Sequence, residues 1–270
     1  MNKISRAEFL KISSASIGGI LLLPHHSCSG TSNKKLTING ISNYQIVIPN
    51  NPSKIEKEAS NQLKEHLLLL SSKAPKIINE TEYVGRNGIF IGKTKYVNNN
   101  NIDTNTLEED GFMFKNSGDD FFIQGGSEKG LLFGVYSLLE SFGFRKYAAD
   151  DPLDIPSTIN LELPNDVIKV PKINYRTTNY YEGRDSEYAD WNKLSSSDSW
   201  GLFVHTFEVL VPPEKYGESN PEYYSLINGE RNVVTQLCLT NQDMFDVLVK
   251  DLRKRINENP KAKYWSVSQN

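Results

Sequence analysis

Side chains able to bind a polar ligand gather at a few places in the second half of this 270-residue sequence. Aromatic rings of tyrosine stack on the apolar face of a pyranose, while histidine, glutamine, asparagine and arginine bond its hydroxyls or a uronate carboxylate. Six residues meet this criterion at the ends of apolar runs or in a polar aromatic loop: Tyr180, Tyr181, Arg184, His205, Gln269 and Asn270. Their types predict a substrate-binding cleft for sugars.

Each candidate also has a purely structural interpretation. A single histidine or asparagine in such a place is equally well explained as satisfying buried backbone groups or capping the next helix. For Asn241, which directly precedes an amphipathic segment, the helix cap is the stronger interpretation.

Hydrolysis of a glycosidic bond needs two carboxyl groups about 5–10 Å apart. Four acids follow the tyrosine pair within one polar loop, namely Glu182, Asp185, Glu187 and Asp190. Such a run is typical of a solvated surface, so the sequence assigns no catalytic residue.

Other chemistries find less support in the sequence. The segment from Gly88 to Thr94 has three residues between its glycines where a phosphate-binding loop has four. The sequence holds 4 histidines, two of them near its start, and 2 cysteines without metal-ligand spacing. We therefore expect neither a cofactor nor a metal site. The net charge of −3 offers no basic field to nucleic acid.

The elements expected to position the candidates begin after residue 165. We predict strands at 171–175, 200–204, 235–239 and 263–267, and a helix over 241–257. A strand, an amphipathic helix and a strand form a parallel βαβ unit, and repeated units build barrels. Residues 166–270 are then the start of an α/β (TIM-type) barrel, which would need about 250 residues to close. We expect the chain to be a fragment of a longer protein.

Residues 33–165 read as a separate α+β domain. A strand over 36–49 precedes a helix that starts at the capping box of Ser53 and Glu56 and ends near residue 72. A short strand at 88–91 and a hairpin of 111–114 with 121–124 lead to a second helix, with Ser127 as N-cap and Gly143 beyond its end. We expect a small mixed sheet with both helices on one face.

The first 32 residues have the composition of a signal peptide and tether. Basic residues precede the short apolar run 17–23, and Cys28 follows where a bacterial lipoprotein cysteine is acylated. A cysteine that happens to lie near a cleavage site explains this position equally well. We expect an exported protein in the periplasm or at the cell surface, with contact to the membrane only through a lipid anchor on Cys28.

Two groups of motifs resemble known families. The segments G-L-L-F-G-V-Y-S-L-L-E (130–140) and G-F-R-K-Y (143–147) resemble the end of the N-terminal domain of bacterial alpha-glucuronidases and family 20 beta-hexosaminidases. The segments H-T-F (205–207), N-G-E-R (228–231), Q-L-C-L-T-N (236–241) and V-S-Q-N (267–270) resemble a family of exported bacterial proteins with the same domain order. In the families resembled, the catalytic acid pair comes from later barrel strands.

The resemblance implies a glycoside hydrolase acting on polysaccharide-derived sugars, of which this fragment alone would be inactive. The alternative is a non-catalytic glycan-binding surface lipoprotein that keeps the aromatic cleft. An enzyme needs an acid pair on further strands, whereas a binding protein does not.

Overall fold

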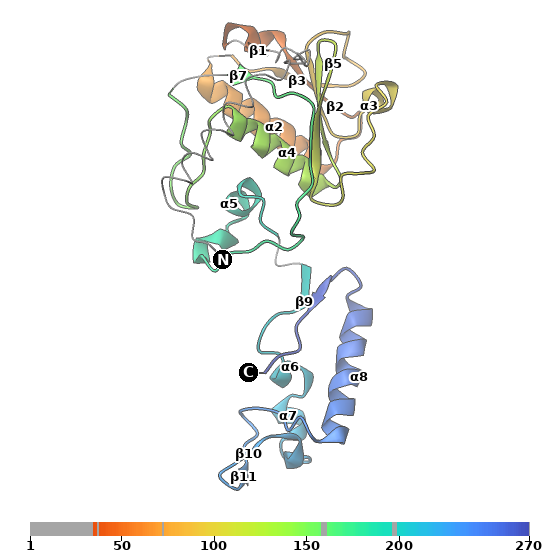
Figure 1. Cartoon of the computed structure of the whole chain (residues 1–270), viewed down its shortest axis with the longest axis vertical. Coiled ribbons are helices and arrows are strands. Elements are labelled where there is room, and N and C mark those ends of the chain that lie inside the picture. Colours follow the sequence, from red (N-terminus) through yellow and green to blue (C-terminus); the bar gives the residue numbers. More distant parts are fainter. Residues whose placement is uncertain (1–34, 37, 72, 158–160, 196–198, 270) are drawn as a thin grey trace, which may run out of the picture.

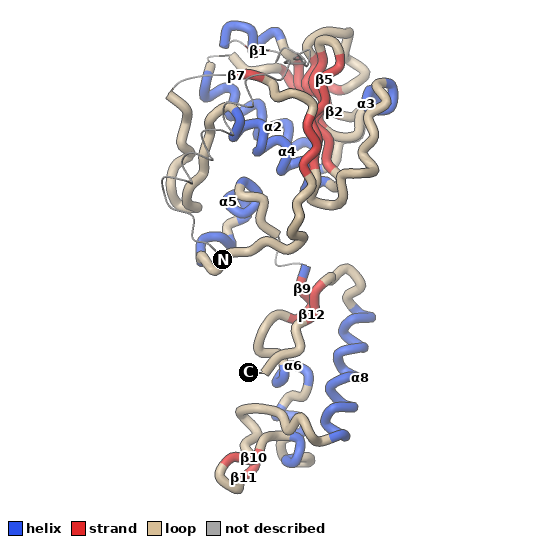
Figure 2. Tube along the Cα trace, in the orientation of Figure 1, coloured by secondary structure: helices blue, strands red, loops and turns tan. Residues whose placement is uncertain are grey.

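The computed structural model describes residues 35–269 except 37, 72, 158–160 and 196–198. Figure 1 shows an elongated molecule in two parts. The first unit comprises the described residues up to 195 and holds a sheet with two long helices. The second unit comprises the described residues from 199 onward and holds one long helix beside short strands, as Figure 2 shows.

The first unit is built on a six-stranded mixed sheet with the order β3-β2-β4-β6-β5-β8. Strands β3, β2, β4 and β6 run parallel, and β5 and β8 are antiparallel to their neighbours. The strands are β2 (Gln45–Ile48), β3 (Lys76–Asn79), β4 (Gly88–Ile91), β5 (Phe112–Ser117), β6 (Asp120–Gly125) and β8 (Val167–Lys169). The sheet therefore extends past residue 165.

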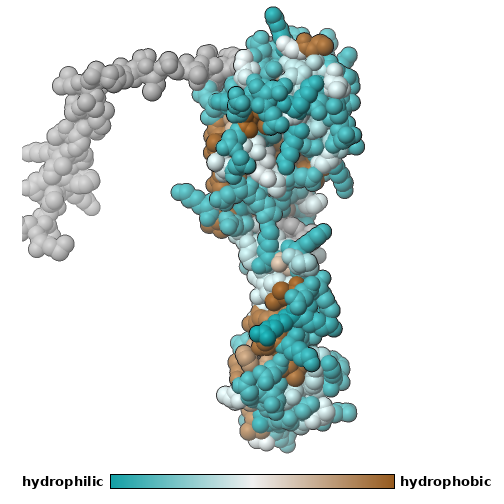
Figure 3. Space-filling model, turned by 90° about the vertical axis from the view of Figure 1, so that its right-hand side faces the viewer, coloured by the Kyte–Doolittle hydropathy of each residue, from teal (hydrophilic) through white to brown (hydrophobic). Residues whose placement is uncertain are grey.

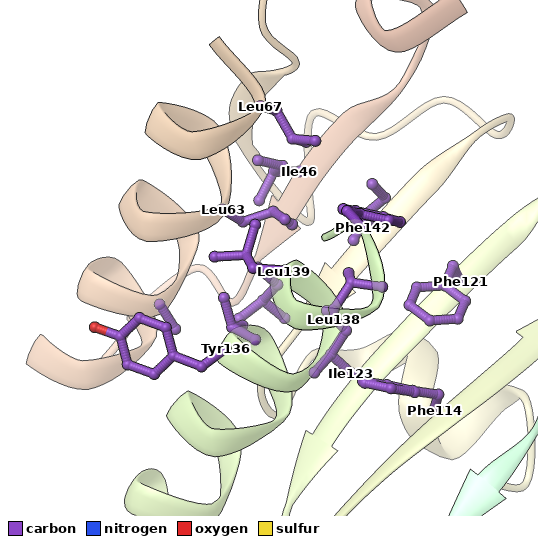
Figure 4. Close-up of a cluster of buried hydrophobic side chains, with 14 of the residues drawn as sticks. Ile46, Leu63, Leu67, Phe114, Phe121, Ile123, Tyr136, Leu138, Leu139 and Phe142 are labelled. Atoms are coloured by element: carbon purple, nitrogen blue, oxygen red, sulfur yellow. The ribbon is translucent and has the colours of Figure 1, made fainter. Parts of the chain in front are cut away.

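Helices α2 (Lys54–Leu70) and α4 (Glu128–Ser141) cover one face of this sheet. Figure 4 shows Leu63 and Leu67 of α2 and Leu139 of α4 packed toward Ile46 and Ile123 of the sheet. Successive residues of a strand point to opposite faces of the sheet, so the strands contribute alternate side chains to this core. The expected mixed sheet with both helices on one face is confirmed.

The opposite face has a smaller core under α3 (Lys95–Asn99) and the loops around it. Phe90 and Phe122, from neighbouring parallel strands, stack with ring centroids 4.5 Å apart. Because both faces are covered, β4 is apolar throughout, with all 4 residues buried.

Local capping confirms the expected starts of both helices. The Ser53 side chain accepts from the Glu56 N–H, and Glu56 accepts from the Ser53 N–H, which completes the capping box. The Ser127 hydroxyl accepts from the N–H groups of Lys129 and Gly130. Gly143 follows the C-cap with φ +105°, a conformation that glycine adopts without steric cost.

The start of the first unit differs from expectation. Residues 36–49 were predicted as one strand, but a 3-10 helix, η2 (Ile38–Asn43), separates β1 (Lys35–Leu36) from β2. β1 pairs instead with β7 (Leu161–Glu162). The apolar residues of this segment are not strictly alternating, which is compatible with a turn of helix as well as with a strand.

The second unit holds one parallel strand pair, β9 (Trp200–Leu202) with β12 (Tyr264–Trp265). Helix α8 (Gln242–Glu258) lies between them in sequence and packs on α6 (Phe207–Leu210) through a core that includes Met244 and Leu248. The remaining elements are α7 (Pro213–Tyr216), η5 (Pro221–Tyr223), β10 (Leu226–Ile227) and β11 (Glu230–Arg231).

Two predicted strands of this region are wrong. Residues 171–175 have no strand pairing, and of residues 235–239 only Leu237 forms a single bridge, to Tyr224. The parallel partner of β12 is β9, not 235–239, so the crossover between the paired strands is longer than expected. Neither run has a continuous buried face: Leu237 is 5% exposed, but Ile173 is 67% and Leu239 65% exposed.

Residues 186–195 pack on the first unit, whereas the ring of Tyr175 contacts Trp200 and Tyr264 of the second unit. Helix α5 (Ser186–Trp191) ends at Trp191, which is 2% exposed. Its ring centroid lies 4.8 Å from that of Tyr136 on α4 and 5.4 Å from that of His66 on α2. The loop before α5 is thereby fixed to the two helices that cover the sheet.

Apolar surface remains on the second unit, and Figure 3 shows it as brown patches there and near the junction of the units. Phe203 is 57% exposed, Val204 50% and Val267 45%, and all three follow the ends of β9 and β12. Among the described helices, none combines the length and apolar composition needed to cross a membrane.

The buried imidazole of His66 predicts a pH-dependent stability. Burial lowers its pKa below the ordinary value of 6.5, against the opposing effects of the Gln62 carbonyl and of Glu187 and Glu65. The unfolded chain therefore binds a proton more readily than the folded chain as pH falls through about 6.5. If the pKa of His66 is one unit lower in the folded chain, the free energy of unfolding is lower by up to about 1.4 kcal/mol at pH values below both pKa values.

We therefore expect the free energy of unfolding to fall between pH 7 and pH 5, and the His66→Phe variant to lose this part of the dependence. Urea unfolding at both pH values measures it. An equal decrease in the wild type and in His66→Phe would contradict the assignment.

Candidate functional site

A cavity of about 710 Å³ lies where the first unit meets strand β9. Its volume falls within the range of about 300–1,000 Å³ that is usual for ligand sites. The described residues that line it are Lys129, Tyr175, Thr177, Thr178, Asn179, Tyr180, Gly183, Arg184, Ser186, Ala189, Asp190, Ser195, Trp200 and Phe203. Two of the predicted sugar-binding residues, Tyr180 and Arg184, are thus part of it.

The polar wall of the cavity comes from the loop held in place by Trp191. This loop contains the 3-10 turn η3 (Tyr181–Arg184), and the Asp185 carboxylate caps α5 by accepting from the Tyr188 N–H at 2.8 Å. The Arg184 guanidinium lies 5.1 Å from the ring centroid of Tyr181, which is itself 71% exposed and outside the cavity lining. The loop therefore places the Arg184 guanidinium, next to the ring of Tyr181, in the lining of the cavity.

The apolar wall comes from aromatic rings around β9. The Trp200 ring has its centroid 5.0 Å from Phe203, 5.6 Å from Tyr175 and 5.3 Å from Tyr264 on β12. The contacts of Trp200 with Phe203 and Tyr175 are edge to face and the contact with Tyr264 is tilted, and rings packed in this way hold one another in place. A flat apolar surface beside hydroxyl and amide groups is suited to a sugar ring.

Two charged groups of the cavity were missed by the sequence-based selection. Lys129, near the start of α4, has its Nζ 3.8 Å from Asp190 Oδ1. Burial raises the pKa of Asp190, although the nearby Lys129 charge opposes this. Asp190 was interpreted as one of four solvated acids, but it lines the cavity, whereas Glu187 and Asp185 do not.

The remaining predicted residues meet at the carboxyl ends of the parallel strands β9 and β12. The Ser268 hydroxyl accepts from the His205 N–H at 3.1 Å, and the Ser268 carbonyl accepts from the Thr206 N–H at 3.0 Å. The Thr206 side chain, 1% exposed, donates to the Ser266 carbonyl at 3.1 Å and accepts from the Ser268 N–H at 3.0 Å. These bonds join residues 60 to 63 positions apart in the sequence.

His205 is held in a strained conformation at this edge. Its φ is +57°, in the left-handed region, which few residues other than glycine adopt, although histidine, asparagine and aspartate adopt it more often than the rest. Its Nδ1 lies 3.2 Å from the Gln269 carbonyl. Because a carbonyl only accepts, this hydrogen bond requires the tautomer in which Nδ1 carries the proton, and in that tautomer Nε2 can accept. An exposed, oriented acceptor of this kind suits a ligand hydroxyl.

The structure thus separates the predicted residues into two groups. Tyr180 and Arg184 line the cavity, with Tyr181 beside it, whereas His205 and Gln269 lie at the carboxyl edge and are not in the described lining. Asn270 and Cys28 lie outside the described residues. Asn241 caps α8 by accepting from the Met244 N–H at 2.9 Å, as its structural interpretation predicted.

Cys238 is half-buried and forms no disulfide with any described residue. Its Sγ lies 3.5 Å from the Thr240 hydroxyl. The hydrogen bond with Thr240 and the proximity of Arg231 lower the pKa of the thiol. In the described part of the chain, no group of three or more histidine, cysteine, aspartate or glutamate side chains is arranged to hold a metal ion.

Two family models match the chain. Residues 30–138 match the glycosyl hydrolase family 67 N-terminus, and residues 147–270 match a domain of unknown function, DUF4838. The resemblance expected from the motifs is confirmed: a glucuronidase-type N-terminal region of a carbohydrate-active family precedes a domain of unknown function. No curated protein matches the chain.

Solved structures offer distant similarities. One is a family GH115 4-O-methyl-alpha-glucuronidase with specificity for decorated arabinogalactans, at 16% identity and a TM-score of 0.36 over 50% of this chain. Another is a GH138 enzyme targeting pectin rhamnogalacturonan II, at 12% identity and a TM-score of 0.33 over 83% of this chain. The matches span 19% and 24% of those two chains.

The strain at His205 predicts an unusual order of stability among its variants. A left-handed residue with a Cβ costs about 1–2 kcal/mol, and glycine avoids this cost but loses more entropy on folding. We expect the His205→Gly variant to be more stable than His205→Ala by about 0.5–1 kcal/mol.

Denaturant unfolding of both variants measures the difference. Lys254, exposed on α8, is the matched position, where Lys254→Ala should be more stable than Lys254→Gly by about 1 kcal/mol. The same order at both positions would show that the backbone at His205 is not strained.

Proposed function

Because a family 67 N-terminal region precedes the parallel strand pair, we propose that the chain is part of an exported glycoside hydrolase acting on polysaccharide-derived sugars. The observation that carries the proposal is the meeting of His205 and Gln269 at the carboxyl edge of β9 and β12. In barrels built from parallel strands, this edge is where substrates bind.

The second unit forms the start of a (β/α)8-type barrel in this proposal. β9 is its first strand in place of 171–175, and α8 and β12 complete the first parallel unit. The described residues from 199 onward make up this domain, and those up to 195 make up the N-terminal domain. The burial of Trp191 among residues of α2 and α4 supports this boundary over one at 165.

Two bonds give the edge a defined chemistry. The His205 imidazole is oriented by the Gln269 carbonyl, and its backbone by the Ser268 hydroxyl. The side chain therefore loses little entropy when it accepts a bond from a sugar hydroxyl. His205 binds and orients the sugar in this account and is not assigned a proton-transfer role.

Non-catalytic glycan binding is the second candidate function. Among the described residues that line the cavity, Asp190 is the one carboxyl group, whereas hydrolysis needs a pair. The single carboxyl group favours sugar binding over hydrolysis as the role of the described cavity residues. Release of reducing sugar by the full-length protein separates the two functions.

Export and lipidation rest on the sequence alone. The basic residues and apolar run before residue 24, followed by Cys28, support a signal peptide with an acylated cysteine. Mass spectrometry of the protein purified from bacterial membranes tests this, since an N-terminal diacylglyceryl Cys28 is expected. An uncleaved chain in the cytoplasm would contradict it.

The sugar-binding role of His205 is tested by affinity electrophoresis of the full chain in gels that contain soluble plant polysaccharides of neutral and acidic composition. We expect His205→Gly, which keeps the backbone conformation without strain, to reduce retention at least about tenfold, equivalent to a loss of about 1.4 kcal/mol. Lys254→Ala, on the exposed face of α8, is the matched control and should migrate as the wild type. Unchanged retention of a folded His205→Gly variant would reject the assignment.

A further inference from the structure

We propose that the cavity between the two units is a second carbohydrate site, selective for a sugar that carries a negatively charged group. It lies apart from the His205 edge and takes residues from both units. The inference rests on the proposed carbohydrate function and goes beyond it in ligand class and location.

The charge of the cavity favours an anion. Its described lining holds two cations, Lys129 and Arg184, and one acid, Asp190. Lys129 and Asp190 are 3.8 Å apart, which is longer than an ordinary hydrogen bond of about 2.7–3.2 Å. The ammonium group can therefore bond an incoming anion without breaking a short ion pair.

The two cations suit different parts of one anionic group. Lys129 is a compact charge on the rigid helix α4, with a side chain 29% exposed. Arg184 offers a planar fork that can bond two oxygens of a carboxylate or sulfate, and its guanidinium lies 5.1 Å from the ring centroid of Tyr181. A carboxylate and a sulfate share this chemistry.

The rest of the cavity fits the sugar ring. Trp200 and Phe203 supply apolar ring surface, and Tyr180 supplies both a ring and a hydroxyl. Burial of an apolar pyranose face against such rings adds to the electrostatic attraction. A simple inorganic anion would use the cations but not the rings.

The placement of the walls depends on contacts within the first unit and between the units. Arg176 is held by Asp110 at 2.7 Å within the first unit, whereas Lys263 of the second unit, directly before β12, forms an ion pair with Glu109 of the first unit. These two pairs join the loop before β5 to the segments on either side of the cavity. The N-terminal unit is thus part of the binding site rather than a separate accessory.

The test is a titration of the full chain with D-glucuronate, D-glucose 6-sulfate and D-glucose, followed by tryptophan fluorescence. Trp200 lies in the cavity wall, so bound sugar changes its emission, and Trp200→Phe should remove most of the signal. We expect at least one anionic sugar to bind about tenfold more tightly than glucose, and the tighter anion identifies the charged group. Glucose binding as tightly as both anions would overturn the proposal.

Two variants test the charges of the cavity and are expected to change the affinity in opposite directions, and a third variant is the control. Lys129→Met should weaken binding of the anionic sugar five- to tenfold, and Asp190→Asn, which removes the competing carboxylate, should strengthen it two- to fivefold. Lys254→Met on α8 is the matched control and should have no effect. Unchanged affinity in both Lys129→Met and Asp190→Asn, with near-ultraviolet circular dichroism showing intact folding, would overturn the proposal.

Failure of this proposal and failure of the proposed function are distinguishable. If His205→Gly weakens polysaccharide retention while the Lys129 and Asp190 variants have no effect on the small sugars, the cavity proposal alone is rejected. If the cavity variants behave as expected and His205→Gly has no effect, the His205 site is rejected and the cavity remains.

Discussion

The burial of Trp191 is the interaction on which the rest of the arrangement depends. This ring lies between His66 of α2 and Tyr136 of α4, and it is 2% exposed. Truncation of a tryptophan buried in this way typically costs about 3–5 kcal/mol. Because α5 ends at Trp191, the polar loop before it has a fixed position on the first unit.

The second constraint is the parallel pairing of β9 with β12. Parallel strands end at the same edge of a sheet, so the residues that follow them meet there however far apart they are in sequence. His205 and Gln269 are brought together in this way. The bonds of Ser268 with His205 and Thr206 then leave the histidine in its left-handed conformation, a strain typical of functional sites. The fold thus has two candidate ligand sites: the cavity, which depends on the burial of Trp191, and the His205 edge, which depends on the pairing of β9 with β12.

Sequence patterns predicted the parts of this structure that depend on local interactions. The capping box of Ser53 and Glu56, the cap of α8 by Asn241 and the hairpin of β5 and β6 are set by neighbours in sequence, and all three were expected. Strand β3 was missed because a strand of four residues carries little periodicity, and the pairing of β9 with β12 was missed because residues 235–239 were expected to be the partner of the last strand.

The candidate site was predictable only in its residue types. His205, Gln269, Tyr180 and Arg184 were selected because their side chains suit sugars, but their division into two groups depends on how the units pack. Lys129 was missed because an isolated lysine at the start of a helix has no distinguishing pattern. Asp190 was interpreted as solvated because its burial comes from α4, which lies far away in sequence.

Hydrogen–deuterium exchange of the full-length protein, with and without an acidic oligosaccharide released from a plant polysaccharide, tests the central claim most directly. The claim is that sugars bind at the carboxyl edge of β9 and β12. The account predicts slower exchange on binding in residues 203–207 and 264–269, with residues 175–190 protected as well when the cavity is occupied. Protection confined to other parts of the chain, with unchanged exchange at the strand ends, would contradict it.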